Sequence, residues 1–203
     1  MNSLTVNLHL MMATFYRPTK SRFKILMEEP AFPSDTYAIK TQIAHHGLNP
    51  RDALILARPR NGEFTIQTED IVDLIEKHRR STRRGDVCRC EFFHWPIVRY
   101  QENHCCSTEQ AASSLDSILP MRSATCRLSL HDWNVDFAVW CSYKYLNAGP
   151  GAVAGAFVHE RHATNTKLPR FAGWFGNDPN TRFRLHLEPE FNPVAVGRRL
   201  ANQ

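Results

Sequence analysis

One segment combines a lysine, two hydroxyl-bearing neighbours and a glycine-rich turn. Ser142, Tyr143 and Lys144 come at the end of an apolar run typical of a strand, and residues 147–155 (NAGPGAVAG) follow. A lysine amine that is partly removed from water has a lowered pKa and becomes nucleophilic, so it can form an imine with an aldehyde cofactor. The alternative from this motif alone is an edge lysine that points into water.

Zinc-ligand residue types are concentrated in a second segment, which holds Cys88, Cys90, His94, His104, Cys105 and Cys106. Structural zinc sites use ligand pairs two to four residues apart, and neither C-x-C nor an adjacent C-C pair provides that geometry. The run His159-Glu160-Arg161-His162 is one residue short of HExxH, which puts both imidazoles on one helical face. We therefore expect no metal site, and we interpret residues 159–162 as surface charge.

An arginine cluster offers a different class of function. Basic side chains at Arg79, Arg80, Arg83 and Arg84 precede the aromatic residues Phe92, Phe93, Trp95 and Tyr100. Arginines with interleaved aromatic rings can bind single-stranded nucleic acid. No fold signature accompanies them, so solvated arginines are the preferred interpretation, and a nucleic-acid-binding module is the alternative.

Composition indicates one globular domain. The chain has 203 residues, 42% of them hydrophobic and 22% charged, with 25 basic against 20 acidic residues. These values exclude a disulfide miniprotein, a coiled coil and a disordered tail. The longest apolar stretches, such as Leu8–Phe15, are too short to span a bilayer, and no signal peptide leads the chain. We expect a cytoplasmic protein without a membrane partner.

Alternating strand and helix signals position the lysine within an α/β fold. Apolar residues at helical spacing from Leu4 to Phe15, with Asn2 or Ser3 as the cap, predict a buried first helix. Strand-like runs cover residues 22–27 and 52–58, and the helix between them is expected to be capped by Asp35. A further helix begins at Thr68, and residues 135–145 and the run ending at Val158 predict two more strands.

Residues 79–130 show neither the 3.6-residue period of a helix nor the two-residue period of a strand. They contain 8 of the arginines, no lysine and 5 of the 6 cysteines, which is not the composition of a linker. The chain therefore divides into residues 1–78, an anomalous segment 79–130, and residues 131–203.

Four runs of the sequence carry a family resemblance: MNSLTVNLHLMMATFYRPT, KILMEEPAFPSDTYAIKTQI, LHDWNVDFAVWCSYKYLNAGPGAVAGAFVHERH and GWFGNDPNTRF. They resemble kynureninases, pyridoxal 5'-phosphate (PLP) hydrolases of the class V aminotransferase group with fold type I. The resemblance covers residues 1–78 and 130–195 in the same order. It implies an incomplete α/β large domain with a mostly parallel sheet and flanking helices.

The resemblance also implies roles for individual residues. Lys144 matches the lysine that binds the cofactor covalently, and Tyr143 matches the tyrosine that contacts its phosphate and takes part in proton transfer. Leu4 and Thr5 match the phosphate-binding pair at a helix start. The FPSD turn of the family is matched by Phe32, Pro33, Ser34 and Asp35, with the Phe ring stacked on the pyridine. Trp174 matches a tryptophan that reaches the phosphate from the partner subunit.

The implied reaction cleaves the Cβ–Cγ bond of L-kynurenine or 3-hydroxykynurenine, giving L-alanine and anthranilate or 3-hydroxyanthranilate. This reaction belongs to tryptophan catabolism and NAD biosynthesis. Intact relatives are expected to be cytoplasmic homodimers, with a small-molecule substrate and no nucleic-acid partner.

One family motif is missing. A DLAH motif, whose Asp pairs with the pyridine nitrogen, should precede residues 130–134 (LHDWN), where residues 116–127 read DSILPMRSATCR instead. These residues can be back-translated into codons whose nucleotides, when translated from the third base onward, encode FDLAHAVGNVP. We therefore interpret much or all of residues 79–130 as an out-of-frame translation, and expect a strand to be missing from the sheet. The alternative function is a catalytically inactive fragment or pseudoenzyme. We also expect the family's N-terminal region and C-terminal small domain to be absent.

Overall fold

The computed structural model describes residues 2–80, 91–93, 113–115, 129–132, 134–144, 146–171 and 173–187. Cys88, Cys90, the cysteines and histidines of residues 94–106, and the segment 116–127 lie outside the described residues, as do Arg83 and Arg84. The zinc, nucleic-acid and reading-frame interpretations of these residues therefore stay predictions.

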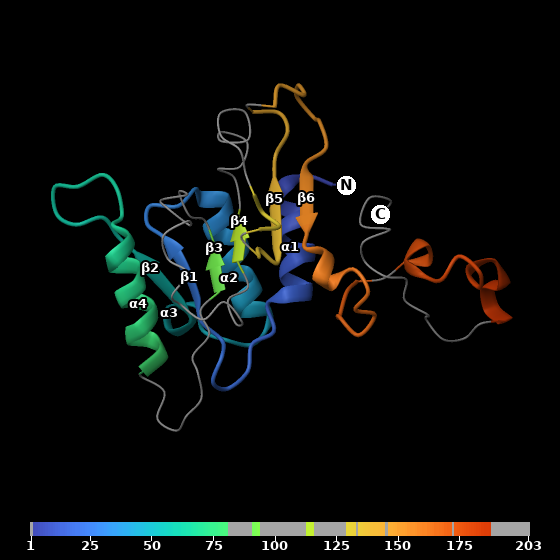
Figure 1. Cartoon of the computed structure of the whole chain (residues 1–203), viewed down its shortest axis with the longest axis horizontal. Coiled ribbons are helices and arrows are strands. Elements are labelled where there is room, and N and C mark those ends of the chain that lie inside the picture. Colours follow the sequence, from blue (N-terminus) through green and yellow to red (C-terminus); the bar gives the residue numbers. More distant parts are fainter. Residues whose placement is uncertain are drawn as a thin grey trace.

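A six-stranded sheet forms the centre of the fold, in the order β2-β1-β3-β4-β5-β6 (Figure 1). The strands are β1 (Ile25–Glu28), β2 (Leu54–Ala57), β3 (Glu91–Phe93), β4 (Ser113–Leu115), β5 (Phe137–Trp140) and β6 (Gly155–Val158). Five are parallel, and β6 pairs antiparallel with β5, so that Trp140 lies opposite Gly155. The prediction of an α/β fold with a mostly parallel sheet is confirmed.

The sheet has no gap where a strand was expected to be missing. Strands β3 and β4 come from the anomalous segment and lie between β1 and β5. The expectation was wrong because backbone N–H and C=O groups make the ladder, so a short strand can pair whatever its side chains are. Strand β4 ends at Leu115, directly before the residues that stand in place of the DLAH motif.

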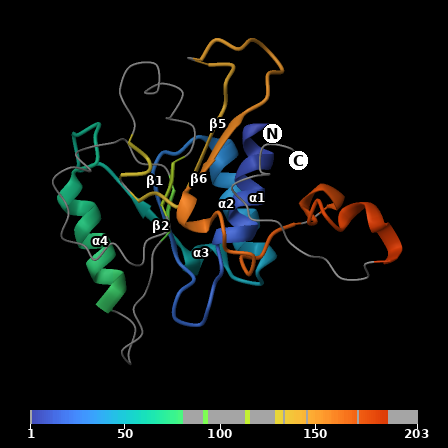
Figure 2. The same ribbon diagram turned by 45° about the vertical axis from the view of Figure 1, so that its right-hand side comes forward.

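Helices cover both faces of the sheet. Helices α1 (Leu4–Phe15) and α2 (Pro33–His45) pack together on one face, and α4 (Thr68–Arg80) packs beside β2 on the other (Figure 2). A short helix, α3 (Pro50–Ala53), leads into β2. The first helix is confirmed, but Asp35 does not cap α2. The cap is Phe32, because Pro33 takes the first helical position, where its missing N–H and fixed φ are favourable.

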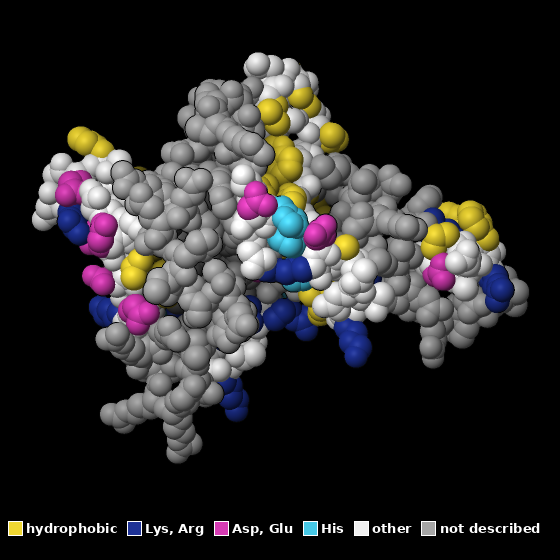
Figure 3. Space-filling model, viewed as in Figure 1, with side chains coloured by type: hydrophobic (Ala, Val, Ile, Leu, Met, Phe, Trp, Pro, Cys, Tyr) yellow, Lys and Arg dark blue, Asp and Glu magenta, His cyan; other side chains and the backbone are white. Residues whose placement is uncertain are grey.

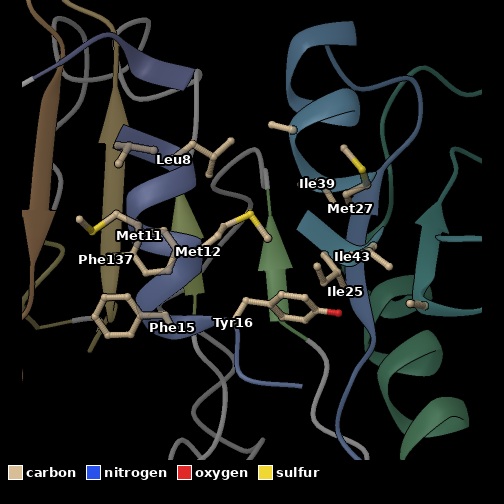
Figure 4. Close-up of a cluster of buried hydrophobic side chains, with 13 residues drawn as sticks. Leu8, Met11, Met12, Phe15, Tyr16, Ile25, Met27, Ile39, Ile43 and Phe137 are labelled. Carbon is tan, nitrogen blue, oxygen red and sulfur yellow. The ribbon is translucent and has the colours of Figure 1, made fainter. Parts of the chain in front are cut away.

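The larger core lies between α1, α2 and the sheet (Figure 4). Ile25 and Met27 of β1 face it, while Leu26 between them faces the second cluster with Ile71 of α4. This alternation follows from the two-residue period of a strand and explains why β1 is apolar on both faces. Fully buried side chains of α1, such as Leu8 and Met12, thereby hold that helix against the sheet.

After β6, the described residues up to 187 form three short 3-10 helices: η1 (Glu160–His162), η2 (Trp174–Gly176) and η3 (Arg182–Leu187). Segment 173–187 extends to one side of the sheet in both ribbon views (Figures 1 and 2). Among the described residues, no helix has the length and apolar character needed to cross a bilayer.

Candidate functional site

Two helix N-termini meet at the edge of the sheet where the parallel strands end. The hydroxyl of Thr5, in the first turn of α1, lies 3.4 Å from the hydroxyl of Ser34, in the first turn of α2. The first N–H groups of a helix have no partner within the helix, and the helix dipole adds partial positive charge there. Two such ends with a hydroxyl each form a setting suited to a phosphate group.

An aromatic ring and an amine face each other beside this hydroxyl pair. Phe32 caps α2 and is 60% exposed, and Lys144 extends its Nζ to 5.5 Å from the centre of the Phe32 ring. The two residues follow β1 and β5, whose carboxyl ends share one edge of the sheet. Lys144 itself is exposed, so the chain alone does not provide the partial burial expected for a nucleophilic amine.

Backbone turns hold the lysine in this position. The carbonyl of Lys144 accepts from Asn147 N at 3.0 Å, and the carbonyl of Ser142 accepts from Ala148 N at 3.1 Å. Asn147 and Gly149 have φ of 53° and 84°, the left-handed region that glycine and asparagine tolerate best. The turns of the glycine-rich run thus return the chain from β5 to its antiparallel neighbour β6.

The remaining residues of the FPSD turn and its neighbours complete this edge. Asp35 is buried in the first turn of α2, and Leu4 packs against the core at the start of α1. Tyr143, next to the lysine, is 52% exposed. A flat aromatic face, an amine and an anion-binding end are therefore close together, and this arrangement fits a planar aldehyde with a phosphate arm.

The structure does not bring Trp174 to these residues. Its indole N–H donates to the carbonyl of Arg182 at 2.8 Å, and its ring meets that of Phe183 edge to face. Both partners belong to segment 173–187, which lies to one side of the sheet rather than over the carboxyl ends of its strands (Figure 1).

An ionic cluster lies at the opposite side of the sheet, where the parallel strands begin, and it was not predicted from the sequence. Asp136, just before β5, accepts from His162 Nε2 at 2.6 Å and also from the guanidinium of Arg161. Burial alone would raise the pKa of the Asp136 carboxyl, but the hydrogen bonds from His162 and Arg161 outweigh burial, so its pKa is lowered. Asp136 is therefore an ionised group that ties the chain after β6 back to β5.

The interpretation of residues 159–162 as surface charge was wrong for the histidines. His159 is 7% exposed and stacks on the ring of His131, with ring centroids 4.6 Å apart. Glu160 is exposed and accepts from His131 Nε2 at 2.9 Å, and this hydrogen bond raises the pKa of His131. Figure 3 shows histidine side chains between acidic ones in this region of the surface. The sequence did contain a signal for this cluster. The glycine-rich turn predicts that β6 returns antiparallel beside β5, and this pairing places residue 136 next to residues 159–162.

Solved structures define the class of fold. An alanine–glyoxylate aminotransferase from Nostoc sp. matches 86% of this chain and 43% of its own, with a TM-score of 0.56 and 16% identity. A C-DES variant with glycine covalently linked to its PLP cofactor matches 96% of this chain and 47% of its own, with a TM-score of 0.59 and 14% identity. The chain thus has the fold type I architecture of PLP-dependent enzymes.

Curated relatives define the family resemblance more narrowly. Kynureninases from Nematostella vectensis, Myxococcus xanthus and Homo sapiens are 46%, 48% and 43% identical over the whole of this chain. The resemblance to kynureninases is therefore confirmed, although no family model matches the sequence. The chain spans 43–47% of the length of these relatives.

Proposed function

We propose that this chain is the part of a kynureninase that binds PLP through Lys144. The observation that carries the proposal is the arrangement of the Lys144 amine 5.5 Å from the Phe32 ring, beside hydroxyls of Thr5 and Ser34 that are 3.4 Å apart on two helix N-termini. PLP has an aldehyde, a planar ring and a phosphate, and each of these groups has a matching partner in that arrangement.

Each residue has a distinct role in this proposal. Lys144 binds the aldehyde carbon covalently, and Phe32 stacks on one face of the ring. Thr5, Ser34 and the first N–H groups of α1 and α2 hold the phosphate; these groups begin at Leu4 in α1 and at Ser34 in α2, because Pro33 has no N–H. Asp35 supports this turn from the core side, and Tyr143 contacts the phosphate and moves a proton. When bound, PLP acts as an electron sink for bonds at the substrate's amino-acid carbon.

The proposed substrate is L-kynurenine or 3-hydroxykynurenine, in tryptophan catabolism and NAD biosynthesis. Its Cβ–Cγ bond is hydrolysed, so that water supplies the hydroxyl of the anthranilate carboxyl group and the remaining carbons leave as L-alanine. The names of the relatives and the match of Lys144 and Tyr143 to the family motif support this assignment.

Cofactor binding and cleavage can be tested on the purified chain. We expect PLP to give the absorbance band of a lysine-bound cofactor, and L-kynurenine to give fluorescent anthranilate. Lys144→Ala should remove both signals, and Lys167→Ala, a change of a lysine in a separate segment, should remove neither. Persistence of the band in Lys144→Ala would overturn the assignment of the lysine.

A second candidate function is an inactive, cofactor-binding fragment or pseudoenzyme. It is favoured by one observation, the absence of an Asp-Leu-Ala-His run from the sequence. Without a carboxylate to keep the pyridine nitrogen protonated, the ring is a weaker electron sink. A chain that shows the cofactor band but releases no anthranilate would establish this candidate.

We also propose that residues 79–130 are translated out of frame. Support comes from the FDLAHAVGNVP reading and from the alignment with the Nematostella kynureninase, which runs over 209 positions and the whole 203-residue chain, so the segment is altered rather than deleted. Sequencing the transcript across codons 79–130 and past codon 196 tests this. If the transcript has a different reading frame that restores DLAH, the result supports the active enzyme. If the transcript encodes residues 79–130 as printed, the result contradicts the proposed frame error.

A cytoplasmic homodimer is the proposed state of the intact protein. Apolar side chains on the loop between β5 and β6 are exposed, including Leu146 at 42% and Val153 at 62% (Figure 3). Such a patch beside the site suits contact with a second copy. In that dimer, Trp174 would reach the partner's phosphate. Sedimentation of the full chain should give twice its monomer mass, and a monomer at all concentrations would contradict the proposal.

A further inference from the structure

A buried asparagine lies in the first turns of α1, on the side away from the phosphate-binding hydroxyls. Asn7 is 4% exposed, whereas Thr5 is exposed and faces Ser34. Successive residues of an α-helix are about 100° apart around its axis, so Asn7 and Thr5 point in nearly opposite directions. Asn7 therefore does not touch the proposed phosphate, and any effect it has on the site acts through other residues.

Hydrogen bonds connect Asn7 to the loop that carries the lysine. The Asn7 Oδ1 accepts from the backbone N–H of Asn2 at 3.2 Å. The carbonyl of Asn2 in turn accepts from the backbone N–H of Ala154 at 2.8 Å. Next to Ala154, the carbonyl of Val153 accepts from the hydroxyl of Ser142 at 2.6 Å.

These bonds span the distance between the two halves of the site. Asn7 and Asn2 belong to the helix start that carries Thr5, and Ser142 lies two residues before Lys144. The other end of the lysine loop is thus held to α1 by the Asn2–Ala154 bond. A shift of Asn2 would displace the loop relative to the phosphate-binding hydroxyls.

The nitrogen of the Asn7 side-chain amide makes this residue unfavourable for folding. Among the residues that the structure describes, the buried Asn7 Nδ2 has no hydrogen-bond partner. An apolar side chain of the same shape avoids that penalty. Residues that break a packing rule in this way are characteristic of functional sites.

We propose that Asn7 is a positioning residue that sets the distance between Lys144 and the phosphate-binding hydroxyls of Thr5 and Ser34. The inference rests on the proposed function, because it concerns how two parts of the PLP site are held at matching spacing. Preorganised spacing lets one molecule bind both parts at once, so the phosphate adds affinity to the lysine bond.

The test compares PLP with pyridoxal, which has the aldehyde but no phosphate. The readout is the ratio of the dissociation constant for pyridoxal to that for PLP, from absorbance titrations of the full chain. Competition by inorganic phosphate measures the phosphate end separately. Loss of a positioning residue lowers this ratio, while the affinities for pyridoxal and for inorganic phosphate stay unchanged. A general loss of stability would instead lower all of these affinities.

Asn7→Leu should lower the ratio by about tenfold, which corresponds to about 1.4 kcal/mol. Asn7→Asp keeps the acceptor for Asn2 and should remain within about twofold of the unaltered chain. Thr14→Val is the matched control, since Thr14 is also a buried polar residue of α1 but bonds the carbonyl of Leu10 in its own helix. It should leave the ratio unchanged.

Ser142→Ala cuts the same connection at its other end, without a change inside the helix, and should lower the ratio in the same direction. It serves as the test if Asn7→Leu does not fold. An unchanged ratio in the folded Asn7→Leu and Ser142→Ala chains would overturn this inference alone. An unaltered chain that binds neither PLP nor pyridoxal would refute the proposed function and this inference with it.

Discussion

Removal of the two hydroxyls at the helix N-termini should weaken PLP binding selectively. Thr5→Val and Ser34→Ala each delete one hydroxyl of the pair that lies 3.4 Å apart. A hydrogen bond to a charged group contributes about 1.5–3 kcal/mol. Because Thr5 is exposed to solvent, we use the lower limit, and each variant should raise the dissociation constant of PLP about tenfold.

The double variant tests whether both hydroxyls bind one phosphate. Neighbouring residues that share a partner are coupled rather than additive. We therefore expect the loss of PLP-binding free energy in the double variant to differ from the sum of the losses in the two single variants by about 0.5 kcal/mol or more. Two independent positions would instead add.

The assay is an absorbance titration with PLP and, separately, with pyridoxal. Pyridoxal affinity should be unchanged in all three variants, because that compound has no phosphate. Thr41→Val is the matched control, since Thr41 lies further along α2 and bonds the carbonyl of Ala38. Equal losses for PLP and pyridoxal, or no loss for either, would refute the phosphate site.

Two further predictions concern stability. Gly155→Ala should lower the free energy of unfolding by about 1–3 kcal/mol, because a methyl group there overlaps the indole of Trp140, whereas Gly173→Ala meets no atom within 4 Å and should be neutral in the same thermal melts. Asp136→Asn should destabilise the chain by about 1–3 kcal/mol at pH 7. The folded-state pKa of Asp136 is below its ordinary value of 3.8, so its ionised form contributes stability above that value, and the difference between the two chains should shrink as pH falls below 3.8. A difference that stays constant in urea melts from pH 7 to pH 3 would contradict the ionic role.

Local patterns predicted the elements that position the site. The spacing of Leu4, Leu8 and Phe15 indicated α1, and the apolar run before Lys144 indicated β5. Both signals come from side-chain periodicity, which the sequence contains directly. The fold class follows from the alternation of such elements.

Other features depend on contacts that periodicity does not encode. The sheet incorporates β3 and β4 from a segment without a pattern, because backbone pairing alone suffices. The contact of Asp136 with His162 arises from the antiparallel pairing of β5 with β6, and the hydrogen bond from Asn2 to Asn7 connects α1 to the residues that precede it. The helix cap at Phe32 in place of Asp35 reflects the preference of Pro33 for the first helical position.

Covalent trapping tests the central claim most directly. The full chain is mixed with PLP, the lysine–cofactor bond is reduced with borohydride, and the peptides are mapped by mass spectrometry. The proposal predicts one modified peptide, with the cofactor on Lys144, and a lower yield of that modification at sub-saturating PLP when Thr5 and Ser34 are both replaced. Labelling spread over exposed lysines such as Lys40 and Lys167, with no preference for Lys144, would contradict it.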